Sequence, residues 1–312
     1  MIYTLTLNPA VDRELTVPVI EFDSVLRAIE SRVDFGGKGF NVSRLLKGMN
    51  EPSVAVGFLG GNAGQLLEKG LRSLGIGTDF VWVPGETRTN VSIVTQSHDH
   101  YLKANEKGPL VDEAKQMELL DKIDSLANPG DWWVLAGSLP PGIANDFYAR
   151  IVNLLNKHEA HAILDTSGES LKLGCMEKPY LVKPNTEEAH VLTGLSMDTP
   201  TEIATAAGEI RRLGARNVVV SMGKAGALLH TAEGTWLTHS PKIQEKNPIG
   251  AGDSMVGGLV WALTLDIPLK EALGWGVASG AATASLPGTE VGSRPSIEQL
   301  YSQVRYERLE AV

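Results

Sequence analysis

Short apolar runs alternate along this chain with longer segments in which apolar residues recur at helical spacing. The runs are rich in β-branched residues, which is typical of buried strands, and they lie at 2–7, 54–59, 132–136, 162–164, 180–182 and 218–220. Helical patterns lie between several of them, at 63–74, 145–157, 186–192 and 201–213. Strands that alternate with helices form βαβ units. The pattern therefore predicts a three-layer α/β fold with a mostly parallel central sheet.

Two segments, 14–35 and 88–103, depart from this rhythm because neither contains a convincing helical pattern. Apolar and polar residues alternate in both, as at Leu15, Val17 and Ile93. We expect them to form a small sheet with one apolar face, which must cover something. It would act as a lid over the functional site, pair with a matching sheet of a partner, or do both. The alternative is a plain extension of the main sheet.

Composition and charge limit the possible functions. The 312 residues are 43% hydrophobic and 21% charged, which suits a single domain over 1–312. The formal net charge is −9 and basic residues form no long run, so neither nucleic acid nor a membrane surface is an expected partner. The lone cysteine, Cys175, and the lack of a long apolar run favour a cytoplasmic protein that acts on small molecules.

The segment 247–254 (NPIGAGDS) is polar and glycine-rich, and it runs straight into an amphipathic pattern over 255–265. A helix that begins there presents unpaired amide groups to an anion, and Gly250 and Gly252 let the backbone approach it closely. Asp253 would repel a phosphate unless it accepts a proton or faces a magnesium ion. We interpret Asp253 as a general base beside an anion hole. The alternative is an ordinary first-turn acid, favoured by the helix dipole.

Polar residues follow four neighbouring strands of the predicted sheet. Ser138 follows the strand 132–136, Asp165 follows 162–164, Lys183 follows 180–182, and Ser221 follows 218–220. Ligands of open parallel sheets bind beyond the carboxyl ends of the strands. These strand ends therefore converge on one predicted site.

The residues that follow two of these strands suit polyphosphate binding. The Lys183 ammonium is a compact charge for phosphate oxygens, and Asn185 with Glu188 would hold the water molecules of a magnesium ion. Glu188 is equally well explained as a solvated helix acid. The next glycine-bearing loop would cradle the phosphates or ribose of a nucleotide, or is simply a hairpin turn; its residues include Ser221, Gly223, Lys224 and Gly226.

A second glycine-rich segment, 36–41 (GGKGFN), precedes another helical run. It presents Lys38 and Asn41 beside bare backbone, although Asn41 is also a good helix N-cap. Asp12 follows the first strand and would hold sugar hydroxyl groups, unless it only builds a turn. No P-loop, dinucleotide-binding fingerprint or HExxH segment occurs.

The segments 36–41 and 247–254, in this order and at this separation, resemble the two signatures of the ribokinase-like (PfkB) sugar kinases. Three further segments look most like the phosphosugar branch of that family, which contains 1-phosphofructokinase, tagatose-6-phosphate kinase and a minor 6-phosphofructokinase; they are 4–9 (TLTLNP), 137–142 (GSLPPG) and 182–185 (VKPN). The resemblance covers nearly the whole chain.

This resemblance implies ATP-dependent phosphorylation of a ketohexose monophosphate, with Mg²⁺ as cofactor. Asp253 would take the proton from the sugar hydroxyl, while Gly250, Ala251 and Gly252 stabilise the transferred phosphoryl group. Asn185 and Glu188 match the magnesium-associated element of the family, and the loop from Ser221 to Gly226 would contact ATP.

The resemblance also implies a substrate site and a homodimer joined through the lid. The residues expected to hold the sugar are Asp12, Gly37, Lys38, Asn41 and Ser138. The candidates for binding its existing phosphate are Arg27, Arg88, Asn90 and Lys103. The segment 88–91 (RTNV) favours fructose 1-phosphate as substrate, whereas 106–109 (EKGP) is closer to tagatose-6-phosphate kinase. A protein that senses a sugar phosphate without turning it over is the alternative from another class.

Overall fold

The computed structural model describes residues 1–97 and 99–309. Within them, ten strands form the central sheet in the order β14-β13-β12-β11-β10-β9-β8-β1-β4-β5. Their bounds are β1 Ile2–Thr6, β4 Val54–Leu59, β5 Gly77–Trp82, β8 Trp132–Ala136, β9 His161–Asp165, β10 Leu181–Val182, β11 Asn217–Ser221, β12 Gly226–His230, β13 Thr235–His239 and β14 Arg305–Leu309.

The strands from β5 to β11 pair in parallel, and β12, β13 and β14 add an antiparallel edge. All the strands expected from the apolar runs belong to this sheet. The predicted α/β fold with a mostly parallel sheet is therefore confirmed.

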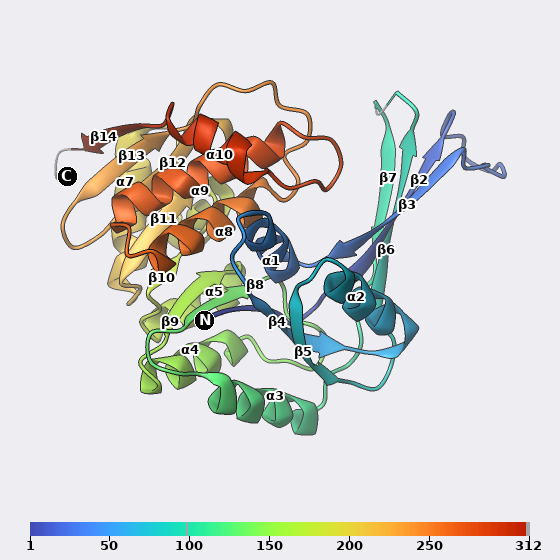
Figure 1. Ribbon diagram of the computed structural model, residues 1–312, viewed down its shortest axis with the longest axis horizontal. Coiled ribbons are helices and arrows are strands. Elements are labelled where there is room, and N and C mark those ends of the chain that lie inside the picture. Colours follow the sequence, from blue (N-terminus) through green and yellow to red (C-terminus); the bar gives the residue numbers. More distant parts are fainter. Residues whose placement is uncertain (98, 310–312) are drawn as a thin grey trace.

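Helices cover both faces of the central sheet (Figure 1). The helix bounds are α1 Lys38–Gly48, α2 Gly61–Ser73, α3 Glu113–Leu126, α4 Phe147–Lys157, α5 Gly168–Met176, α6 Thr186–Thr193, α7 Pro200–Arg212, α8 Ala251–Thr264, α9 Leu269–Ala284 and α10 Arg294–Tyr301. Side chains of β1 point to opposite faces of the sheet, so Leu5 packs beneath α3–α7 and Ile2 packs beneath α1, α8, α9 and α10. None of the described helices is long and apolar enough to span a membrane.

A second sheet projects from one side of this body (Figure 1). It contains four strands in the order β3-β2-β6-β7. They are β2 Ala10–Val17, β3 Glu30–Gly36, β6 Arg88–Thr95 and β7 Tyr101–Asn105. We call this sheet the lid. Its strands lie in and next to the segments 14–35 and 88–103, and they form a sheet separate from the central one rather than an extension of it.

The two faces of the lid differ in polarity. Leu15, Ile93 and Leu102 are neighbours across β2, β6 and β7 on one face. Near the main body this apolar face packs on α2 through Val11 and Phe35. Farther out it is uncovered in the single chain, where Leu102 has 41% of its surface exposed. The other face carries polar residues, because side chains alternate along each strand.

Candidate active site

A cavity of about 640 Å³ lies beyond the carboxyl ends of β9, β10 and β11. This is the edge at which ligands of open parallel sheets bind. The polar residues that line it are Lys38, Asp165, Lys183, Asn185, Glu188, Ser221, Lys224, Ser240, Lys242, Glu245 and Asp253. The structure thus brings together both glycine-rich segments and three of the four polar strand ends.

The N-terminus of α8 forms one wall of this cavity. Gly250 is the N-cap residue and has φ 78°, a left-handed conformation that glycine adopts without strain. Among the described residues, the amide groups of Gly252 and Asp253 have no hydrogen-bond acceptor. Two unpaired donors at the positive end of a helix dipole form a site for an anion. The free donors include Gly252, as expected, together with Asp253. The Ala251 amide, which was also expected to contribute, donates instead to the Pro248 carbonyl oxygen at 3.1 Å.

Asp253 lies beside this anion site and is 8% exposed. Its Oδ2 accepts a hydrogen bond of 2.8 Å from Asn41 Nδ2. Burial raises the pKa of Asp253 to about 6, with a further contribution from the Asp165 carboxylate, and Asn41 and the two nearby lysines partly offset the rise. A carboxylate with such a pKa is ionised at neutral pH and still basic enough to accept a proton.

Asp165 joins two lysines that come from different parts of the chain. Its Oδ1 lies 3.2 Å from Lys38 Nζ and 3.3 Å from Lys183 Nζ, and the residue is only 1% exposed. Burial opposes the charge of Lys38, but Asp165 and Asp253 raise its pKa above the ordinary value. Lys38 therefore stays charged at the cavity. The sequence interpretation placed Asp165 at a strand end without giving it a role.

Asn185 and Glu188 form the capping box of α6. Asn185 Oδ1 accepts from the Glu188 amide at 2.7 Å, and Glu188 Oε2 accepts from the Asn185 amide at 2.8 Å. Both residues still line the cavity, and the second carboxylate oxygen of Glu188 is not used by this motif. Mg²⁺ commonly keeps several waters and takes one or two carboxylates with substrate phosphates, so these residues fit a water-mediated site.

No group of three or more His, Cys, Asp or Glu side chains is arranged to hold a metal within residues 1–97 and 99–309. A metal held mainly by water and phosphate oxygens does not need such a group.

The loop after β11 contributes Ser221, Gly223 and Lys224 to the cavity, whereas Gly226 at the end of this loop does not line it. A Cβ atom at Gly226 would come within 2.0 Å of the Thr238 carbonyl oxygen, because β12 and β13 are closely paired there. The glycine at position 226 is thus explained by strand pairing, and the expectation that it contacts ATP is not supported by its position.

An apolar wall from α9 completes the cavity, and sequence reasoning did not find it. Its residues are Val277, Gly280, Ala281 and Ala284. The wall lies close because α8 and α9 pack through glycines: a Cβ at Gly280 would be 2.9 Å from the Ala251 carbonyl oxygen, and one at Gly276 would be 2.7 Å from that of Met255. These small apolar side chains give one side of the cavity an apolar lining opposite its charged residues.

Asp12 and Asn90 lie together at the base of the lid. Asn90 Nδ2 donates to Asp12 Oδ1 at 2.7 Å. Burial raises the pKa of Asp12, although the Asn90 hydrogen bond and nearby cations oppose the rise. Gly36 is needed here because a Cβ would fall 2.1 Å from Asp12 Oδ2. Gly37 is the N-cap residue of α1, where a Cβ would come within 2.9 Å of the Phe40 ring.

Arg88 is engaged with the backbone at the start of β6. Its guanidinium donates to the Asn8 carbonyl oxygen at 2.9 and 3.2 Å and to that of Glu106 at 3.3 Å. These bonds hold the end of β1 to the segment after β7. Arg88 therefore has a structural role that the sequence did not indicate. Ser138 is exposed just after β8, the strand that pairs with β1.

Lys103 and Arg27 occupy different parts of the lid. Lys103 is exposed and pairs with Ser92, so it shares the polar face with Asp12. Arg27 lies in the exposed connection between β2 and β3, beyond the Thr16 and Glu30 pair. That end of β2 is roughly 20 Å from its base at the strand rise of about 3.3 Å per residue. Within one chain, Arg27 is therefore not brought to the substrate site.

A family model described as "pfkB family carbohydrate kinase" matches residues 5–296. The chain belongs to this family. The family resemblance expected from the two glycine-rich segments is thereby confirmed. As a PfkB carbohydrate kinase, the protein transfers phosphate to a hydroxyl group, and the family implies ATP as the donor.

Three relatives of this PfkB kinase are informative. A protein named 1-phosphofructokinase from Bacillus subtilis (strain 168) is 37% identical over 309 residues, which are 99% of this chain and 100% of the relative. A D-tagatose-1-phosphate kinase from Bacillus licheniformis is 34% identical over 311 residues, with 99% and 100% coverage. The tetrameric inhibited form of phosphofructokinase-2 from Escherichia coli superimposes with a TM-score of 0.90 at 29% identity and covers 97% of this chain and 98% of that one.

Proposed function

We propose that this PfkB kinase is a 1-phosphofructokinase. It transfers the terminal phosphoryl group of Mg-ATP to the free primary hydroxyl of fructose 1-phosphate and gives fructose 1,6-bisphosphate and ADP. The observation that carries this proposal is Asp253, a buried carboxylate with a raised pKa beside the free amides of α8 and in contact with Asn41. The similarity to 1-phosphofructokinase of Bacillus subtilis over nearly the whole chain supports the choice of substrate.

Asp253 is the proposed general base. It accepts the proton of the attacking hydroxyl while the oxygen forms its bond to phosphorus and the bond to ADP breaks. Asn41 holds the carboxylate at 2.8 Å and fixes its orientation. The amides of Gly252 and Asp253 donate hydrogen bonds to the transferred phosphoryl group. Phosphoryl transfer depends mainly on positioning and charge stabilisation, so these groups supply its main requirements.

Lys183 and Lys38 are proposed to bind phosphate oxygens of ATP, both on the phosphoryl group that is transferred and on the ADP that is released. Asp165 keeps both ammonium groups at the cavity, because each lies within 3.3 Å of the same carboxylate oxygen. Asn185 and Glu188 would hold a hydrated Mg²⁺ ion. When bound, this ion neutralises part of the charge on the phosphate oxygens. Ser221, Gly223 and Lys224 contact the nucleotide, whose base packs on α9.

The sugar is proposed to lie between α1 and the polar face of the lid. Asp12 accepts hydrogen bonds from its hydroxyl groups and Asn90 donates hydrogen bonds to them. Gly37 and Ser138 lie at the border of the site. Lys103 is the cation of this face best placed to select a substrate that already carries a phosphate. Arg88 supports the same region through its bonds to the Asn8 and Glu106 carbonyl groups.

We propose that two chains associate through the apolar face of the lid. Its outer part is uncovered in one chain, and a small sheet with an exposed apolar face is poorly stable alone. The tetrameric form of the Escherichia coli relative supports self-association in this family. Arg27 and its connection lie at the outer end of the lid, so they come near a substrate site only if a partner brings them there. We also propose that the enzyme acts in the cytoplasm, because its reaction uses ATP.

A tagatose phosphate is the second candidate substrate. The relative named D-tagatose-1-phosphate kinase and the segment 106–109 (EKGP) favour it. Both candidates use the same base and the same nucleotide site. They differ in the configuration of the sugar at C4 and, for tagatose 6-phosphate, in the position of the phosphate that the lid must accept.

Steady-state kinetics with a panel of acceptors tests the proposal. We expect the highest kcat/KM with fructose 1-phosphate, lower values with tagatose 6-phosphate and fructose 6-phosphate, and a loss on the order of 10⁴-fold with free fructose, because a site cation is then left unpaired. Preference for a tagatose phosphate would overturn the substrate and keep the mechanism. Equal turnover of free fructose would overturn both the substrate class and the role of the lid.

A further inference from the structure

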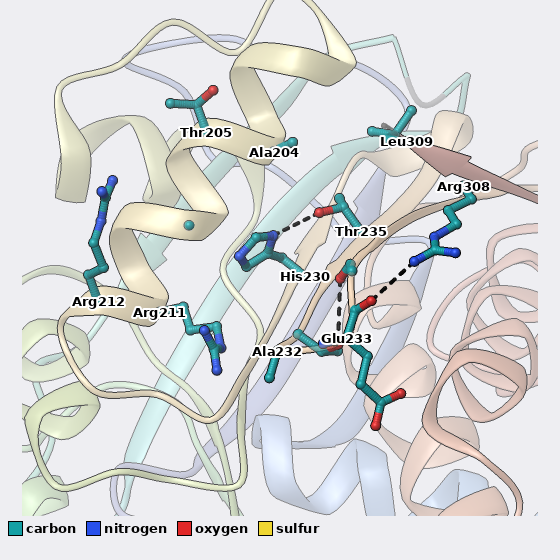
Figure 2. A pocket seen from close by; sticks show the side chains of 13 residues that line it. Ala204, Thr205, Arg211, Arg212, His230, Ala232, Glu233, Thr235, Arg308 and Leu309 are labelled. Atoms are coloured by element: carbon teal, nitrogen blue, oxygen red, sulfur yellow. Dashed lines mark hydrogen bonds between the residues drawn. The ribbon is translucent and has the colours of Figure 1, made fainter. Parts of the chain in front are cut away.

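A second open pocket, of about 770 Å³, lies between α7 and the hairpin that joins β12 to β13. Figure 2 shows His230 pointing from β12 toward α7, with Arg211 and Arg212 on the helix side and Arg308 on the opposite side. We call this the arginine pocket. Its volume lies in the range of small-molecule sites, which is roughly 300–1,000 Å³.

The arginine pocket is positively charged although the chain is acidic. It is lined by three arginines and one acidic residue, Glu233, whereas the whole chain carries a formal charge of −9. Glu233 points away from His230 (Figure 2). Arg212 is paired with Glu209 on the same helix. Arg211 donates to the Arg216 carbonyl oxygen at 3.1 Å and makes no ion pair within the part of the chain described above.

His230 adds a neutral donor to this pocket. Its Nδ1 lies 2.8 Å from the Thr235 hydroxyl, which can donate to it and so leave the proton on Nε2. Burial lowers the pKa of His230, and Arg211 and Arg212 lower it further. The imidazole is therefore uncharged near neutral pH, with Nε2 facing α7. An anion placed between His230 and Arg211 would reverse that effect and raise the pKa.

Gly208 keeps the space in front of His230 open. It lies inside α7, where glycine is less favourable than alanine. A Cβ atom at this position would meet only His230, at 3.7 Å from Nε2, which is ordinary van der Waals contact. Packing therefore does not require glycine here. A methyl group would instead occupy the space beside the Nε2 donor.

The arginine pocket is separate from the catalytic cavity. Ser221 and Gly226 lie at the ends of β11 and β12 that border the catalytic cavity, whereas His230 pairs with Val218 at the other end of these strands. Among residues 1–97 and 99–309, none lines both cavities. A ligand in the arginine pocket would therefore not compete directly with ATP.

We propose that the arginine pocket binds a compact metabolite that carries phosphate or carboxylate groups, with Arg211 and His230 as its principal donors and Arg308 as a further cation. Guanidinium groups pair with either kind of anion in a bidentate geometry. The proposed ligand is thus a small molecule with several negative charges. The probe that binds more tightly shows whether these charges are phosphates or carboxylates.

NMR titration of the His230 imidazole tests this proposal. Pyrophosphate and citrate serve as probes, with the catalytic cavity filled by a non-hydrolysable ATP analogue, and the His230 signal is assigned by its loss in His230→Gln. We expect a saturable shift and a raised pKa of His230 with at least one probe, and the tighter probe identifies the anion class. Arg211→Gln should weaken binding by roughly tenfold or more, because a charge-assisted hydrogen bond is lost.

Two further variants provide the controls. Gly208→Ala should also weaken binding while leaving the fold intact, whereas Arg72→Gln, which removes the same charge from α2, should leave the His230 response unchanged. Kinase activity should stay unchanged in all these variants. No saturable shift with either probe, or the same response in Arg211→Gln as in the unmodified protein, would overturn the proposal without affecting the proposed kinase reaction.

Discussion

Asn41 donates a hydrogen bond of 2.8 Å to the Asp253 carboxylate across 212 positions of sequence. The contact joins the two glycine-rich segments at the N-termini of α1 and α8. Asn41 is thus more than a residue at the start of a helix, because it orients the proposed base and lowers its pKa against the effect of burial. The proposed sugar and phosphate sites meet at this bond.

Replacement of Asn41 by leucine should move the pH dependence of the reaction to higher pH. The general base works in its deprotonated form, so activity falls as the pH drops through the pKa of Asp253, which is about 6. Asn41→Leu removes a hydrogen bond to the charged form and should raise that pKa. The acid limb of the kcat/KM profile should shift upward, and an unshifted limb would show that Asn41 does not act on the base.

Asp165→Asn should shift the same limb in the opposite direction. The Asp165 carboxylate raises the pKa of Asp253, so its neutralisation should lower that pKa. Because Lys183 and Lys38 lose their shared partner, stability should also fall, on the order of 3 kcal/mol. The pH profile separates the two effects, since a purely structural role for Asp165 predicts lower stability with an unchanged profile.

Gly280→Ala should destabilise the protein and weaken ATP binding. A methyl group at this position would press on the Ala251 carbonyl oxygen from 2.9 Å and push α9 away from the first turn of α8. We expect a loss of about 1–3 kcal/mol in unfolding free energy and a raised KM for ATP. Gly208→Ala in α7 is the matched control, because its methyl group meets no backbone; it should stabilise the protein by about 0.5–1 kcal/mol. Chemical denaturation and kinetics measure both effects, and equal behaviour of the two variants would refute the packing argument.

Ile93→Asp should convert the proposed dimer into monomers. Ile93 lies on the apolar face of the lid between Leu15 and Leu102, so a carboxylate there would be buried on association. Ser92→Asp is the control, since the neighbouring residue points to the opposite face. Light scattering at micromolar concentration should give a dimer for the unmodified protein and for Ser92→Asp. A monomeric unmodified protein would rule out association through the lid.

Much of the fold was predictable because the central strands are buried on both faces and therefore consist of continuous apolar runs. Of the central strands that were not predicted, two lie at the edges of the sheet, where their sequences are less apolar than those of the buried strands. β14 Arg305–Leu309 is mostly exposed and carries alternating charges, and β5 Gly77–Trp82 begins with polar residues. Their places in the sheet are decided by pairing with β13 and β4 rather than by local apolar content.

The candidate site was predictable where a residue type and its local segment define the chemistry, as for Asp253 and Lys183. Asp165 was not, because its role depends on two lysines that only the folded chain brings to one carboxylate. Gly226 and Arg27 do not line the cavity of their own chain, for a related reason. Gly226 is required by the close pairing of β12 and β13. Arg27 lies at the far end of the lid, away from the substrate site of its own chain.

Asp253→Asn should also raise the stability of the protein at neutral pH. The pKa of Asp253 rises from 3.8 to about 6 on folding, so folding favours its protonated form. The resulting cost is absent below pH 3.8, grows as the pH rises through this interval, and reaches about 3 kcal/mol at pH 7. An uncharged asparagine avoids this cost. Denaturation of both proteins at pH 7 measures the difference, and a less stable variant would argue against a strongly raised pKa.

The turnover of Asp253→Asn with fructose 1-phosphate and Mg-ATP tests the proposed base most directly. The variant keeps the shape of the side chain and loses the proton acceptor. We predict that kcat falls by roughly 10²-fold or more while the affinities for ATP and for the sugar phosphate change by only a few-fold. A well-folded variant with nearly normal kcat would contradict the assignment and leave Asp253 as a first-turn helix acid.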